Sequence, residues 1–145
     1  MKLLLKIFLA TSFLTLASCY PQKLMDKISD AKKLEINNHK FINRPLKYVL
    51  RQIKPEIKFV YGNPENEWAG ANGGTSLTFY FNDKQEAKKR VSRNDIPTNI
   101  IIRFNLEPIN NRKLLPKDGL NEWTHKETKE YGDMIIRSIE VSGEN

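Results

Sequence analysis

Residues 99–107, with the sequence NIIIRFNLE, are the most apolar of the segments whose side chains alternate with a period of two. Such alternation predicts a β-strand with one face in the hydrophobic core. Ile101 adds apolar surface to the second face, and Pro108 ends the segment because proline cannot donate a hydrogen bond to a strand ladder. The alternating apolar side chains are Ile100, Ile102, Phe104 and Leu106.

Three more segments show strand periodicity, at residues 57–61, 76–82 and 133–141. In the last of them the alternation slips between Ile136 and Ile139. A slip of this kind predicts a β-bulge or burial on both faces. Leu34-Glu35-Ile36 is a fifth, very short candidate strand, and residues 109–121 are expected to form a loop.

Helical spacing of apolar residues is clearest over residues 44–53, which end before Pro55. Thr124 and Glu127 have the spacing of a capping box and predict a helix over 124–131, with Gly132 just past its end. In the charged stretch 84–94, Asp83 predicts the cap of a short helix, and a solvated loop remains the alternative.

The predicted order of elements is helix, strand, strand, strand, helix, strand. Segregated helices and strands predict the α+β class. We expect a mostly antiparallel sheet of about four strands with two or three short helices on one side. Residues 34–145 are expected to form a single domain, and residues 19–33 a polar tether that includes a short helix through Leu24, Ile28 and Ala31.

Residues 1–18 combine an early positive charge, an apolar body and small residues at the end, which is the order of an export signal. The tetrad Leu16-Ala17-Ser18-Cys19 follows, and Cys19 is the only cysteine. The tetrad resembles a bacterial lipoprotein signal. The resemblance covers only this end of the chain and assigns the rest to no family.

The resemblance implies that residues 1–18 are cleaved off as a signal peptide and that Cys19 carries acyl chains such as palmitate. Two chains anchor a protein stably, whereas one holds it only marginally. Tyr20 stands where an aspartate would signal retention in the inner membrane, so we expect the outer membrane, facing the periplasm. The alternative is ordinary cleavage after Ala17, which would leave an unpaired thiol in an oxidising compartment.

Residues suited to catalysis are sparse. His39 and His125 are the only histidines, and neither has a second ligand at a metal-binding spacing. The chain contains no Gly-x-Ser-x-Gly nucleophile elbow. We therefore expect no enzyme activity, no metal and no cofactor.

The long loop over residues 62–75 joins two predicted strands and holds Glu65, Glu67 and Trp68. Loops of this length are uncommon unless they are functional or disordered. An exposed Trp68 would anchor a partner, with both glutamates beside it; alternatively Trp68 folds back over the sheet edge. Trp123 is expected to belong to the core.

The formal charge is +7 and falls to +5 once residues 1–18 are removed. This charge suits contact with anionic lipid headgroups or an acidic envelope protein, and also serves solubility alone. The export signal argues against nucleic acid as a partner. The leading hypothesis is a membrane-anchored, non-catalytic binding or structural module; the alternatives are an inhibitor or immunity-type lipoprotein and a small envelope enzyme.

Overall fold

The computed structural model describes residues 23–63, 76–105 and 120–143. These residues form a five-stranded sheet in the order β4-β1-β2-β3-β5, in which all neighbouring strands run antiparallel. The fold therefore belongs to the α+β class, as expected. The strands are β1 (Phe59–Asn63), β2 (Ser76–Tyr80), β3 (Asn99–Phe104), β4 (Leu120–Glu122) and β5 (Ile136–Ser142).

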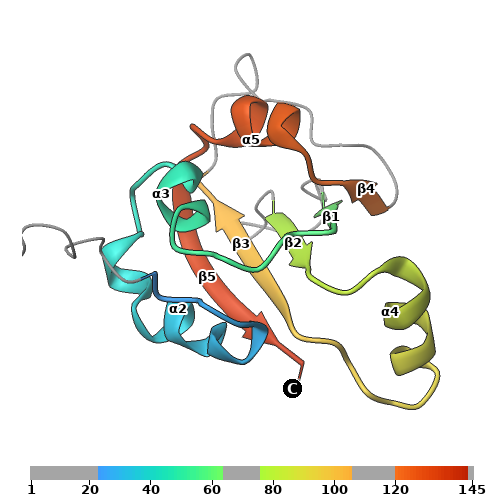
Figure 1. Cartoon of the computed structure of the whole chain (residues 1–145). Helices are drawn as coiled ribbons and strands as arrows, with labels where there is room; N and C mark the ends of the chain where they lie inside the picture. The colour runs from blue at the N-terminus through green and yellow to red at the C-terminus, as the bar shows by residue number, and fades with distance from the viewer. Residues whose placement is uncertain (1–22, 64–75, 106–119, 144–145) are drawn as a thin grey trace, which may run out of the picture.

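Short helices surround this sheet. Figure 1 shows α2 and α3 beside β5, α5 across the top, and α4 standing apart beside the other end of the sheet. The α-helices are α2 (Lys32–Ile36), α3 (Leu46–Leu50), α4 (Lys84–Val91) and α5 (His125–Tyr131), and the 3₁₀ helices are η1 (Ile28–Asp30) and η2 (Asn38–Lys40).

The core lies on one face of the sheet. The strand register aligns Val60, Phe79 and Ile100 in one row, and every one of these side chains is fully buried. The next core row contains Leu77, Ile102 and Ile139. Since successive side chains of a strand point to opposite faces, Phe59, Tyr80 and Asn99 form a row on the other face.

The bulge predicted for the last strand is confirmed. Arg103 pairs with Ser138 while Phe104 pairs with Ile136, so Arg137 is the extra residue of β5. The extra residue shifts the alternation by one position. It thereby lets both Ile136 and Ile139 reach the core, where they are 0% and 1% exposed.

The structure differs from the expectations at the N-terminal side. Leu34-Glu35-Ile36 lies in helix α2, so the short strand predicted there is wrong. Residues 23–33, which we assigned to a tether, pack against the domain: Met25 is fully buried and bridges Ile53. Packing therefore begins well before residue 34.

Two further differences concern the sheet and its helices. The strand β4 begins at Leu120, within the expected loop of residues 109–121, and ends at Glu122. It raises the number of strands from the expected four or so to five. The helix α4 departs from the expectation that all helices cover one side, because it borders a groove with Phe59 and Tyr80 on the other face.

Candidate functional site

A cleft of about 530 Å³ lies between α3 and α5. Its base is apolar and includes Leu50, Ile57 and Trp123. Pockets of about 300–1,000 Å³ are typical of small-ligand sites in proteins. The cleft is thus large enough to receive a small molecule or a side chain of a partner.

Trp123 is held firmly at the base of the cleft. Its ring meets Phe79 edge-on, with centroids 4.9 Å apart and planes at 86°, and lies 6.3 Å from the ring of Tyr131. Edge-to-face pairs of this kind add stability beyond the area they bury. Trp123 packs against the core while remaining partly exposed, which agrees in part with the expectation that it belongs to the core.

The two walls of the cleft are joined by backbone hydrogen bonds. Leu46 N–H donates to the carbonyl of Met134 at 2.9 Å, and Lys47 N–H donates to the carbonyl of Gly132 at 2.8 Å. The ammonium of Lys47 also pairs with Asp133 at 2.7 Å. These bonds satisfy amides at the start of α3 and fix it beside the end of α5.

Gly132 permits a tight ending of α5. A Cβ atom at this position would lie 2.4 Å from the carbonyl oxygen of Thr128 and 3.6 Å from the Cβ of Lys47. Ordinary Cβ contacts begin near 3.4 Å, so a side chain would clash with the last turn of α5 itself, whereas its contact with Lys47 of α3 would be ordinary. The glycine expected just past the helix is thus required for space, since its φ of −58° is ordinary.

The opposite end of α5 is fixed by the predicted capping box, which the structure confirms. Thr124 accepts from Lys126 N–H at 3.1 Å, and Glu127 accepts from Thr124 N–H at 2.9 Å. The hydrogen bond from the Thr124 hydroxyl, followed by those from backbone amides, lowers the pKa of Glu127 below its usual range. The box sets the orientation of α5 and hence of His125 and Lys129 at the cleft.

The charges around the cleft are mostly positive. Lys47, Arg51 and Lys129 line it, with His125 beside them, whereas Asp133 is the one acid in its lining and is already paired with Lys47. Cations gathered on one concave surface raise its affinity for anions. The cleft therefore suits an anionic group that has an apolar part to cover Trp123.

Arg51 is positioned by a ring as well as by its helix. Its guanidinium lies 5.7 Å from the centroid of the Tyr48 ring, and that of Arg44 lies 6.0 Å from the same ring. Cation–π contacts at these distances stabilise exposed pairs modestly. They also limit the conformations available to Arg51 at the edge of the cleft.

The residues singled out in the sequence fall in different places. Cys19, Glu65, Glu67 and Trp68 lie outside the described residues. His39 and His125 are both exposed, as expected for surface histidines, and His125 lines the cleft. Over residues 23–63, 76–105 and 120–143, no three His, Cys, Asp or Glu side chains gather in a way that would hold a metal ion.

Sequence reasoning missed the cations of the cleft. Lys47 and Arg51 are four residues apart on a helix, a spacing that places both side chains on the same face. This spacing in the sequence could have indicated a pair of cations on one surface. Lys129 lies far along the chain, and nothing local indicates that its helix would face α3.

Comparison of the chain with protein-family models, with curated proteins and with solved structures gave no match. Among the helices of the described residues, none combines the length and apolar character needed to span a membrane.

Proposed function

We propose that this protein is a lipid-anchored component of the bacterial cell envelope whose domain acts as a non-catalytic binding module. The tetrad Leu16-Ala17-Ser18-Cys19 supports the anchor, and the preceding apolar segment supports export. With acyl chains on Cys19, the domain faces the periplasm from the outer membrane.

The observation that carries the binding role is the cleft between α3 and α5. It unites a partly exposed Trp123 with Arg51 and Lys129, while Lys47 and Asp133 pair with each other. Catalysis by paired carboxylates needs two acids, and the described residues that line the cleft include one, so this lining supports binding over hydrolysis. We propose that the ligand presents an anionic group to these cations.

The inhibitor or immunity hypothesis draws on the same cations. An acidic loop of a hydrolase or toxin would place carboxylates against Arg51 and Lys129 and an apolar side chain on Trp123. On this hypothesis, a deletion strain is more sensitive than its parent to lytic enzymes or rival bacteria. Equal resistance of the two strains would count against the inhibitor role.

The anchor is tested on protein purified from membranes. Intact-mass analysis is expected to show a chain that begins at Cys19 and carries acyl groups, and the protein should stay on membranes in high salt. Cys19→Ala should prevent this processing, and the variant protein should no longer stay on membranes in high salt. A mature protein with an unmodified first residue would contradict the anchor without touching the proposal for the cleft.

The cleft is tested by crosslinking in intact cells, with a photoreactive amino acid in place of Thr128. Lys129→Glu should lower the yield of the crosslinked species several-fold, since it reverses one charge at the cleft. Lys126→Glu is the matched control, because it makes the same change on the same helix at an exposed residue outside the lining. Equal yields in the two variants would rule out an anion-binding role for the cleft.

A further inference from the structure

A second hollow lies on the opposite face of the sheet from the cleft. It is a groove of about 490 Å³ between α4 and the sheet. Phe59, Tyr80 and Asn99 form its sheet side, and Ala87 and Val91 of α4 form the other. The lining is largely apolar, so the groove is chemically distinct from the cation-lined cleft.

The helix α4 is held by its two ends. Asp83 caps its N-terminus by accepting from Glu86 N–H at 2.8 Å. At the C-terminus, Asn94 adopts φ of 57°, and Asp95 N–H and Asn94 N–H donate to the carbonyls of Arg90 and Val91 at 3.0 Å each. This pattern is a Schellman motif, which satisfies the last carbonyls of a helix.

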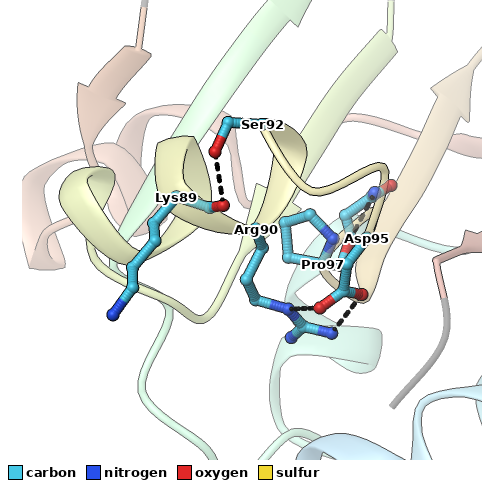
Figure 2. Close-up of polar contacts among 6 residues, drawn as sticks. Lys89, Arg90, Ser92, Asp95 and Pro97 are labelled. Atoms are coloured by element: carbon cyan, nitrogen blue, oxygen red, sulfur yellow. Dashed lines mark hydrogen bonds and ion pairs between the residues drawn. The ribbon is translucent and has the colours of Figure 1, made fainter.

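A fork of hydrogen bonds closes the same end, as Figure 2 shows. The guanidinium of Arg90 donates to the two carboxylate oxygens of Asp95 at 2.7 and 2.8 Å, and the Ser92 hydroxyl donates to the carbonyl of Lys89 at 2.8 Å. These contacts stabilise α4 as a helix although it buries none of its residues. The helical side of the groove is therefore a stable surface even without a ligand.

The apolar side chains on the helix side of the groove are unusually exposed. Val91 is 57% exposed and Ile96 is 56% exposed. The sheet side is firm, since the rings of Phe59 and Tyr80 stack with centroids 4.7 Å apart and planes at 19°. A ligand with an apolar body would cover Val91 and Ile96 and release the water around them.

Positive charge borders this apolar surface. Lys84 and Lys88 line the groove, four residues apart and thus on one face of α4. Within α4 there are four basic residues and a single acidic one, Glu86. The charge at the groove is complementary to a ligand whose apolar body ends in an anionic head.

Asn99 adds a polar feature to the floor. Its side chain is 5% exposed, and its Nδ2 donates to the carbonyl of Pro97 at 3.1 Å. Its Oδ1 is buried and has no partner among the described residues. A buried acceptor without a partner carries a desolvation cost of about 1–3 kcal/mol, which a ligand's hydroxyl or N–H donor would remove.

The size of the groove favours a small ligand over a protein. A helix of eight residues is about 12 Å long. Stable protein interfaces bury about 800 Å² on each partner, which is far more than one side of so short a helix supplies. A volume of about 490 Å³ instead falls among small-ligand pockets.

We propose that the groove between α4 and the sheet binds a single-chain amphiphile, with its acyl chain over Phe59 and Val91, its anionic head at Lys88, and a hydroxyl near that head donating to Asn99. The assignment is independent of the cleft and of the anchor at Cys19. It adds a lipid-binding activity to the protein.

The test uses the full chain held in nanodiscs of zwitterionic lipid and a diazirine-bearing analogue of 3-hydroxymyristate as the probe. After irradiation, mass spectrometry should place the label on the peptides that contain Ala87, Val91 and Ile96. Competition with unlabelled 3-hydroxymyristate gives the affinity. Myristate, which lacks the hydroxyl, should compete several-fold less well.

Matched variants test the contribution of individual residues of the groove. Lys88→Glu should weaken competition about tenfold, since it removes a charge-assisted contact, while Lys89→Glu on the same helix but outside the lining should leave it unchanged. Ala87→Trp should fill the groove and abolish labelling, and because Ala87 lies on a helix with no buried residue, the fold should persist. Retained circular dichroism would confirm that persistence.

Four outcomes would overturn the proposal. Equal affinities of the Lys88→Glu and Lys89→Glu variants would contradict the placement of the anionic head at Lys88. Equal competition by myristate would contradict the hydrogen bond between the ligand's hydroxyl and Asn99. Unchanged labelling in the Ala87→Trp variant would exclude the groove itself. If a photoreactive phospholipid of the nanodisc labels α4 while the free amphiphile does not, the groove is a membrane contact instead.

Discussion

Gly132 lies just past the end of α5, where a backbone hydrogen bond joins it to α3. The residue receives a backbone hydrogen bond from Lys47 and leaves no room for a side chain beside Thr128. Its role is steric, because the conformation itself is open to any residue. A side chain at this position would therefore disturb the last turn of α5, which lines the cleft.

Gly132→Ala is therefore expected to lower the free energy of unfolding by about 1–3 kcal/mol, the usual cost of overpacking. The new methyl group would displace the carbonyl of Thr128. Chemical denaturation measures the loss. Lys129→Ala, an exposed change on the same helix, should alter stability by less than about 0.5 kcal/mol. A Gly132→Ala protein as stable as the parent would show that the contact relaxes freely.

Among the elements, α4 is the one that depends on its own ends. It carries no buried side chain, so its capping residues and the Arg90–Asp95 pair replace tertiary packing. The side-chain hydrogen bond from Arg90 lowers the pKa of Asp95 below 3.8, and the same contact raises the pKa of Arg90. The stability of this helix is therefore linked to the charge of one carboxylate.

The sign of the pH dependence follows from the lowered pKa of Asp95. A carboxyl whose pKa is lower in the folded state contributes stability above its unfolded value, and the contribution is lost as the pH falls through the folded value. We expect the amides of α4 to exchange hydrogen faster as the pH falls below about 4, relative to intrinsic rates. At neutral pH, Asp95→Asn should cause the same acceleration in α4 and leave β2 and β3 unchanged.

The control for this prediction is the protection of the central strands, whose side chains are buried in the core. If Asp95→Asn accelerated exchange equally in α4 and in the sheet, the pair would contribute to global stability rather than to α4 alone. If exchange in α4 did not change at all, the Schellman motif and the Asp83 cap would be sufficient for the helix.

At the scale of the whole molecule, one core on one face of the sheet joins the N-terminal segment, the strands and α5. Phe79 lies at its centre, paired with Val60 and Ile100 and in edge contact with Trp123. Both hollows depend on this sheet, since the cleft rests on its core face and the groove on the opposite face.

Phe79→Ala should lower the free energy of unfolding by about 3–5 kcal/mol, because it removes a fully buried aromatic ring and leaves a cavity. It should also shift the fluorescence of Trp123, which loses its edge contact. Tyr61→Ala, at a 41% exposed residue of the neighbouring strand, is the matched control and should cost much less. Similar losses for the two variants would contradict the placement of the core.

Local signals in the sequence account for much of this structure. The alternation along residues 99–104, the slip before Ile139 and the capping box at Thr124 all predict what is observed, because each involves neighbours along the chain. The tetrad ending at Cys19 is equally local and supports the proposed anchor. These features need no knowledge of which segments meet.

The rest was decided by contacts between distant segments. β4 has only three residues, too few to show a period, and it exists because it pairs with β1. Leu34 takes part in a helix because the buried face of α2 packs near β5. The cleft sets Lys47 beside Lys129, and the groove sets Ala87 opposite Phe59. The sequence alone determined the periodic strands, the helix caps and the proposed lipid attachment, whereas both binding surfaces arose only when the sheet brought separate elements together.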